Sequence, residues 1–329
     1  MHRTATFYDL KITARGVSQA SENEANFETD PLSLREMYAL IDQLFKGGDP
    51  ILKKGRSEKS ARYYISDLEL RNDRLIFLIN RCDPNAPDAV SSDPENKSRV
   101  VHTKPPGHGG DYSAHVIIPL QPTRGDNYYL CVVETVFGSG LHASSIKDYM
   151  RFIFAYCRKH FPERFLIPNI NGARDADGNP LMVRHIHTVE LLGHPSSEFQ
   201  EELETGVLTG IELLDFTERG AVWDDRGAVF EDAKFVKLRP QRSLAGSLAA
   251  MVRQVRNKAA EQREYAQMRI RFKNEKGEPR DATIDTDTGN LVDINKYIKR
   301  HIIQAPLVNV ASLNQINNGI IKEMLELME

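Results

Sequence analysis

Cysteine is scarce in this chain of 329 residues, which has only Cys82, Cys131 and Cys157 and no Cys-x-x-Cys pair. An odd, widely spaced set argues against a disulfide framework and a cysteine-based zinc site, and it favours a reducing compartment. No apolar run approaches the roughly 18 residues that a membrane-spanning helix needs, and no signal-peptide pattern follows Met1. These absences predict a cytoplasmic protein whose only connection to a membrane would be a partner.

Acidic residues are scarce in one segment. Residues 234–273 contain eleven lysines and arginines but only two acids, Glu261 and Glu264, so the segment carries +9. Because the whole chain carries −3, the rest of it carries −12. This polarisation indicates a surface that meets a polyanion. The predicted contact residues are Lys234, Lys237, Arg239, Arg242, Arg253, Arg256, Lys258, Arg263, Arg269, Arg271 and Lys273.

Hydrophobic periodicity and turn residues predict a mixture of strands and helices. Short turns join most neighbouring strands, which favours an α+β class with largely antiparallel sheets and packed helices. We expect a globular body over residues 1–230, with a long loop at 83–112, and a basic region over 231–329. The expected elements of the body are strands at 4–13, 63–70, 75–81, 114–120, 128–136, 182–192 and 210–216, and helices at 34–44, 144–160 and 197–204.

The basic region predicts a strand at 233–238, a helix at about 243–265, a hairpin at 268–272 and 280–285, and a C-terminal helix at 313–328. On a helical wheel Leu244, Leu248, Met251 and Val255 share one arc. Arg253, Arg256 and Arg263 fall on a neighbouring arc. Strand alternation puts Arg269, Arg271 and Lys273 on one face. Rows of cations on rigid elements match the phosphates of duplex DNA, so we predict binding to duplex DNA without sequence preference.

Two other readings of the charge remain open. The basic surface would also suit an acidic protein partner, or the acidic remainder of a second subunit. A secondary basic stretch precedes the first expected hairpin and consists of Lys53, Lys54, Arg56, Lys59 and Arg62.

Catalytic and metal-binding patterns are weak. His185 and His187 point to the same side of an expected strand, but two ligands without a clear third are a poor metal site. Gly138-Ser139-Gly140 precedes a helix and lacks the Walker lysine, so a strand-to-helix turn is favoured over an anion site. Glu134 is an isolated candidate for a buried acid. We therefore expect no catalytic residue, metal or cofactor, and a metal-dependent nuclease remains the alternative.

The order of several stretches resembles the RexA-like family of phage-exclusion DNA-binding proteins. The resemblance covers roughly residues 60–300, except 83–112 and 162–181, which have no counterpart. The stretches that carry it are Glu134-Thr-Val-Phe-Gly138 with the following helix that contains Ile146 and Tyr149, Val183-Arg-His-Ile-His187, Phe235-Val-Lys-Leu-Arg-Pro240, Met268-Arg-Ile-Arg-Phe through Lys276-Gly277-Glu278, and Thr288-Gly289-Asn290-Leu291.

This resemblance implies a non-catalytic homodimer that binds duplex DNA, with a globular body and a movable part. It also implies a sensor of phage DNA in bacterial antiviral defence, with a membrane protein encoded alongside as effector. A protein–protein adaptor is a further alternative.

Overall fold

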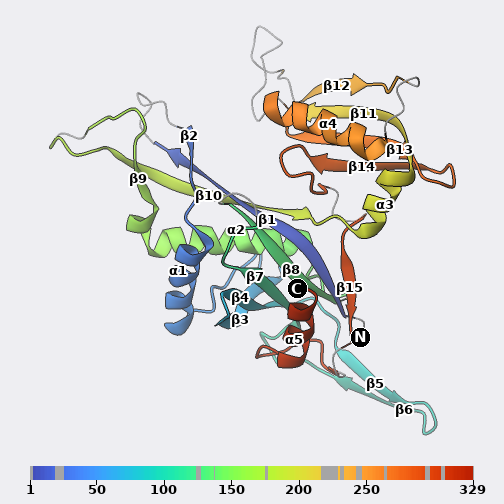
Figure 1. The fold of residues 1–329 in the computed structure, drawn as a ribbon. Helices are drawn as coiled ribbons and strands as arrows, with labels where there is room; N and C mark the ends of the chain where they lie inside the picture. Colours follow the sequence, from blue (N-terminus) through green and yellow to red (C-terminus); the bar gives the residue numbers. More distant parts are fainter. Residues whose placement is uncertain are drawn as a thin grey trace. The chain divides into compact units, whose positions relative to one another are not determined.

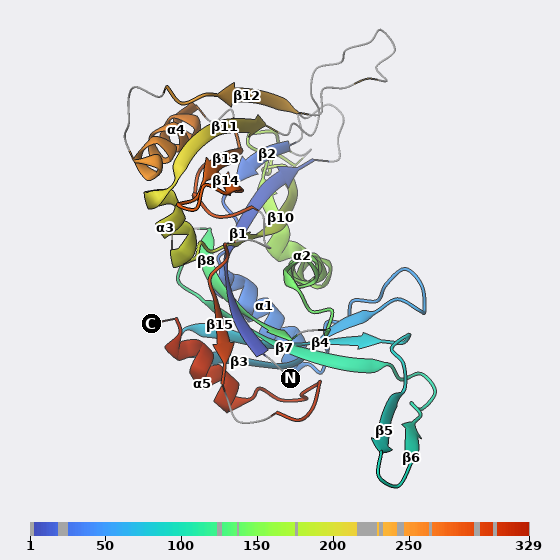
Figure 2. The same cartoon turned by 90° about the vertical axis from the view of Figure 1, so that its right-hand side faces the viewer.

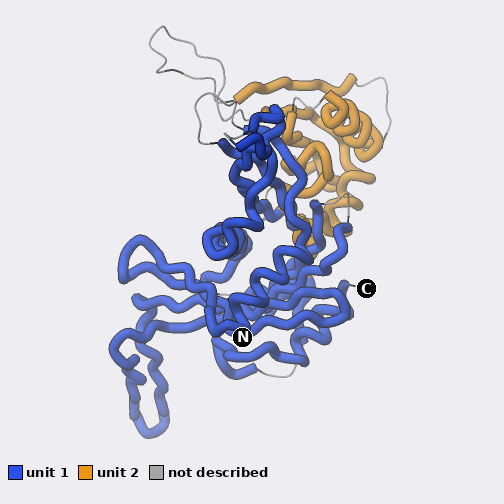
Figure 3. Tube along the Cα trace, turned by 90° about the vertical axis from the view of Figure 1, so that its left-hand side faces the viewer, with its two compact units in different colours: residues 1–6, 10–191, 301–329 blue, residues 7–9, 192–300 orange. Residues whose placement is uncertain are grey.

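The computed structural model divides the chain into two compact units (Figure 3). The first unit contains residues 1–6, 10–191 and 301–329, and the second contains residues 7–9 and 192–300. The structure describes residues 3–18, 26–123, 127–136, 138–174, 177–215, 229, 233–241, 247–262, 265–292, 297–304 and 308–328.

The first unit is built on a nine-stranded sheet (Figure 1). Its strand order is β3-β4-β7-β8-β1-β10-β9, and β2 and β15 also pair with β1. The strands are β1 (Arg3–Val17), β2 (Asn26–Thr29), β3 (Arg62–Arg71), β4 (Arg74–Asp83), β7 (Gly110–Pro119), β8 (Tyr128–Val136), β9 (Leu166–Pro168), β10 (Met182–Gly193) and β15 (Arg300–Ile303). The helices are α1 (Leu34–Lys46), α2 (Ala143–His160), the 3-10 turn η1 (Pro162–Phe165) and α5 (Asn318–Glu326).

Both faces of this sheet are covered. Tyr129 of β8 accepts a hydrogen bond from Leu34 N at the start of α1 (3.3 Å), so α1 covers the face that bears Tyr129. Five residues on, Glu134 lies on the opposite face. On that face His115 Nε2 of β7 accepts a hydrogen bond from Asn317 N (3.0 Å) in the C-terminal segment. The sheet is therefore the middle of three layers.

Local sequence signals explain where the helices begin. Ser33 caps α1 in the expected capping box, because Glu36 N donates to its hydroxyl and Ser33 N donates to the Glu36 carboxylate. The C-terminal helix begins later than expected, at Asn318 instead of residue 313. Asn317 accepts hydrogen bonds from Gly319 N and Ile320 N, and this cap sets the start.

The segment 83–112 is not the long loop that its composition predicts. It contains a separate two-stranded hairpin, β5 (Ala89–Asp93) and β6 (Ser98–His102), and its last residues begin β7. The hairpin extends away from the rest of the first unit in two perpendicular views (Figures 1 and 2). All its residues are exposed, so it lacks the apolar alternation by which a half-buried strand is recognised.

The second unit is a four-stranded antiparallel sheet with two helices. Its strand order is β12-β11-β13-β14, so β11 is a central strand. The elements are α3 (Ser197–Thr205), β11 (Val207–Asp215), β12 (Lys234–Leu238), α4 (Leu248–Gln262), β13 (Gln267–Lys273) and β14 (Pro279–Asp285). One face of this sheet is apolar and buried: Ile211, Met268, Ile270 and Ile284 are at most 3% exposed.

These observations confirm the α+β class with largely antiparallel sheets. The compact units divide the chain differently from the expected boundary after residue 230. Residues 192–215 belong with the basic elements because β11 hydrogen-bonds to both β12 and β13. The C-terminal helix belongs to the first unit. In the described part of the chain, no helix is both long and apolar enough to cross a membrane.

Candidate nucleic-acid interface

The cations of β12 and β13 converge on one carboxylate. Glu212 in β11 lies directly between Lys237 on β12 and Arg269 on β13, because both are its cross-strand partners. Directly opposed residues share a face of a sheet. Arg271 donates a hydrogen bond to the Glu212 carboxylate (3.1 Å), and Lys237 Nζ and Arg269 Nη1 lie 3.6 and 3.7 Å from it. We call Lys237, Glu212, Arg269 and Arg271 the cation cluster.

Burial separates the acid from the cations. Glu212 is 7% exposed, whereas the side chains of Lys237, Arg269 and Arg271 are 75%, 42% and 51% exposed. The carboxylate therefore lies beneath and holds the three cations in place, while their charged ends remain accessible to a ligand. Lys273 is also exposed and lies on the same face by alternation. The expected alternation of β13 is confirmed, because Ile270 and Phe272 are buried on the other side.

An exposed aromatic ring accompanies the cation cluster. Phe235 precedes Lys237 by two residues on β12, so the two share a face. It is 61% exposed. A large ring beside cations on an edge strand is a potential stacking surface for a planar ligand.

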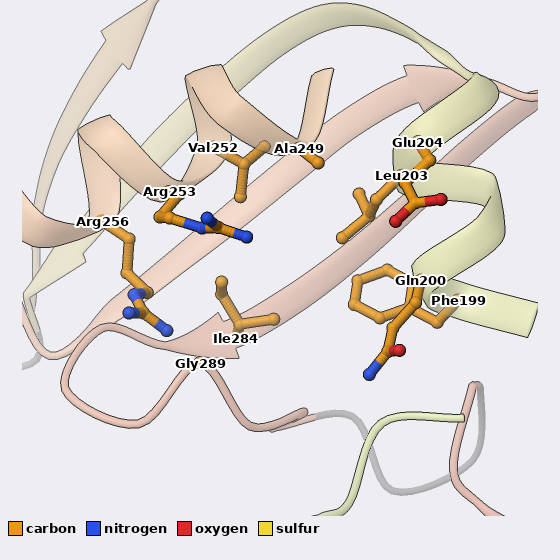
Figure 4. A pocket seen from close by; sticks show the side chains of 10 residues that line it. All are labelled: Phe199, Gln200, Leu203, Glu204, Ala249, Val252, Arg253, Arg256, Ile284 and Gly289. Carbon is orange, nitrogen blue, oxygen red and sulfur yellow. The ribbon is translucent and has the colours of Figure 1, made fainter. Parts of the chain in front are cut away.

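Helix α4 lies on the opposite side of the same sheet. Its Met251 and Val255 line a small cavity together with Leu208, Ile211 and Leu238, which point away from the cation cluster. Arg253 and Arg256 line a different pocket between α3 and α4 (Figure 4). The structure thus does not bring the expected arginine arc and the hairpin cations onto one face. Helical periodicity places residues around a helix, but it does not show which side of a sheet the helix covers.

The remaining predicted contact residues are dispersed. Lys234 is exposed on the alternate face of β12, opposite Asp215. Arg239 lines the small cavity beside α4, and Lys258 is exposed on α4. Arg242 and Arg263 lie outside the described residues.

The secondary basic stretch belongs to the first unit, before and at the start of β3. Lys54, Arg56 and Lys59 are exposed. Lys53 Nζ donates to the Asp148 carbonyl (3.2 Å) and lies 5.7 Å from the centre of the Tyr63 ring.

The two strand histidines face the helical layer of the first unit. Their ring centroids are 4.3 Å apart, and His187 Nε2 accepts a hydrogen bond from Leu32 N (2.9 Å). Burial lowers the pKa of His187 to about 3, and the neighbouring charges of His185 and Arg158 add to this effect. Glu190 lies on the exposed face of β10. Within the described ranges, no group of three or more His, Cys, Asp or Glu residues could hold a metal ion.

Glu134 is buried, and it has two partners that sequence reasoning did not identify. Arg3 of β1 forms an ion pair with it, and His115 of β7 contacts it through both ring Nδ1 and backbone N. Burial alone would raise the pKa of Glu134, but the hydrogen bond and charge of His115 and the charge of Arg3 lower it overall. All three residues are at most 5% exposed. The cluster anchors the C-terminal segment, because Arg3 also donates to the Val310 carbonyl.

The glycine-rich stretch before α2 forms a tight turn, as expected. Gly138 and Gly140 have positive φ angles of 79° and 68°. Arg81 Nη1 donates to the Ser139 carbonyl (3.3 Å), and Leu141 N donates to the Ser139 hydroxyl. Phe137, which belongs to the stretch shared with the phage-exclusion family, lies outside the described residues.

Two features of the candidate interface were missed in the sequence. Glu212 gave no signal as an isolated acid in an apolar strand, because its role depends on the pairing register of β11. Phe235 was read only as part of a strand. No protein-family model matches this chain, and no curated protein is significantly similar to it.

Proposed function

We propose that the chain binds duplex DNA without sequence preference through the open face of the second unit. The observation that carries this proposal is the cation cluster, in which Glu212 fixes three exposed cations on rigid strands. Cations that are already ordered lose little side-chain entropy when they contact phosphates.

The test is a salt titration of affinity for a duplex of mixed sequence. The variant K237Q/R269Q/R271Q is made together with E212Q, so that no unpaired carboxylate stays buried. Each lost phosphate contact lowers the slope of log K against log salt by about 0.9. We therefore expect the slope to become shallower by about 2 to 3 and the affinity to fall equally for every duplex.

A matched control removes the same net charge elsewhere. K46Q/K159Q changes two exposed lysines of the first unit, and we expect it to bind DNA like the unaltered chain. Equal affinities of the cluster variant and the control would show that the open face does not bind DNA.

Single-stranded nucleic acid is a second candidate, and the exposed ring of Phe235 favours it. Stacking of a base on an aromatic side chain contributes about 1–3 kcal/mol. F235A would then weaken binding to a single strand by about fivefold or more and leave duplex binding unchanged. Competition between the two forms at one salt concentration identifies the preferred one.

The biological role that we propose rests on the resemblance to phage-exclusion proteins. In it the chain acts as a homodimeric, non-catalytic sensor of phage DNA, and a membrane protein encoded alongside is the effector. Bacteria that express the chain with its neighbouring genes should lower phage plating efficiency. The cluster variant should abolish that protection while the control retains it.

A further inference from the structure

We propose that the pocket between α3 and α4 binds a nucleoside monophosphate, or the same group at the end of a nucleic-acid strand. Figure 4 shows the pocket, with Arg253 and Arg256 entering from α4 and Gln200, Leu203 and Glu204 facing them from α3. Its volume of about 340 Å³ lies at the lower end of the range of roughly 300–1,000 Å³ for small-molecule pockets.

The arginines supply an anion-binding end. Arg253 is exposed and has no hydrogen-bond or ion-pair partner in the described part of the chain. Arg256 Nη1 donates to the Thr288 carbonyl (3.4 Å) and Nη2 to the Asn257 side chain (3.2 Å), which fix the guanidinium in the wall of the pocket. Two guanidinium groups match the charge and geometry of a phosphomonoester better than that of a single carboxylate.

A glycine admits the second arginine. Gly289 has a φ of +77°, and a Cβ at this position would lie 2.3 Å from Arg256 Nη1. Any other residue would displace the guanidinium from the pocket wall. The Thr288-Gly289-Asn290 turn, which the sequence comparison singled out, is therefore a positioning element for Arg256.

The rest of the pocket suits the nucleoside. Its apolar lining consists of Phe199, Leu203, Ala249, Val252 and Ile284. Gln200 and the exposed Glu204 supply hydrogen-bond acceptors on the α3 side, where a second anionic group would be repelled. An anion at one end, a planar apolar body and hydrogen-bond donors at the other end describe a nucleotide with one phosphate group.

This pocket is separate from the proposed duplex-binding face. Ile284 and Val252 belong to the buried side of the four-stranded sheet, whereas the cation cluster lies on its open side. A duplex that contacts the open face would not reach Arg253. The proposal therefore stands or falls independently of DNA binding by the cation cluster.

The experiment is calorimetric titration of the full chain with thymidine 5′-monophosphate. Thymidine lacks the anion and inorganic phosphate lacks the apolar body, so we expect each to bind at least about tenfold more weakly. R253A removes one guanidinium from an exposed helix position and should weaken nucleotide binding about tenfold, by the loss of a charged hydrogen bond of about 1.5–3 kcal/mol.

The matched control is K258A, which removes an exposed cation from α4 outside the pocket. It should bind the nucleotide like the unaltered chain. The proposal is overturned if the nucleotide binds no more tightly than inorganic phosphate, or if R253A and K258A behave alike.

A competition experiment distinguishes the two sources of the ligand. A short single strand with a 5′-phosphate should displace thymidine monophosphate if strand ends are bound, and the same strand with a 5′-hydroxyl should not. If neither strand displaces the nucleotide, the free nucleotide is the ligand.

Discussion

Glu212 opposes the charge of the surface that it organises. It holds Lys237, Arg269 and Arg271 in place, yet its negative charge also reduces the attraction of that face for phosphates. Two unit charges about 4 Å apart interact by about 1 kcal/mol in water and by more near a protein surface. The acid therefore contributes order at the expense of field strength.

We predict that E212Q binds DNA about fivefold more tightly than the unaltered chain, from about 1 kcal/mol of removed repulsion. The same change should lower the thermal midpoint, because three cations lose their shared partner. Fluorescence anisotropy at low salt and a thermal melt measure the two effects. Weaker DNA binding by E212Q would show that cation order matters more than net charge.

His187 links folding to pH. Its folded-state pKa is about 3, against 6.5 for an unperturbed histidine. Between these values the unfolded chain binds a proton that the folded chain does not, so stability is lost as pH falls below about 6.5. The contribution reaches at most about 1.4 kcal/mol for each pH unit.

We predict that H187Q shows a smaller loss of stability on acidification, since glutamine can accept the Leu32 hydrogen bond without titrating. Urea unfolding at pH 7.5, 6.5, 5.5 and 4.5 would give a shallower dependence for H187Q below pH 6.5 and parallel curves above it. Curves that stay parallel throughout would show that His187 is already protonated in the folded chain.

At the scale of elements, local patterns were sufficient where one face of an element is buried. The hairpin of β3 and β4, helix α2 and strand β13 lie where alternation and helical spacing placed them. The hairpin of β5 and β6 was missed because both its faces are exposed, which removes the periodic signal.

The arrangement of the candidate site required more than pattern. The sequence identified Arg269 and Arg271 as neighbours on one face, because strand alternation fixes this locally. It did not identify Glu212 as their shared partner, nor the side of the sheet that α4 covers. Both depend on pairing between strands far apart in the chain, and no local periodicity encodes register or layer order.

At the scale of the molecule, the charge is polarised within the second unit. Residues 192–300 contain 18 lysines and arginines and 19 acids, so the unit carries only −1. The acids of α3 (Glu198, Glu201, Glu202 and Glu204) accompany the helical layer, while the cation cluster lies on the open face of the sheet. A boundary drawn after residue 230 by charge thus separates the basic elements from the central strand on which they pair.

This topology predicts which fragments fold. A fragment of residues 192–300 retains all four strands with α3 and α4, and it lacks only residues 7–9, from which Phe7 N donates to the Lys299 carbonyl and Asp9 contacts His194. A fragment of residues 231–329 lacks β11, so β12 and β13 lose the strand between them and Ile270 and Met268 lose packing partners. We expect cooperative thermal unfolding by circular dichroism for 192–300, with a lower midpoint than the full chain. The fragment 231–329 should show no cooperative transition, because two separated edge strands and a hairpin cannot bury a core. A cooperative transition in 231–329 would mean that its elements do not need β11 to fold.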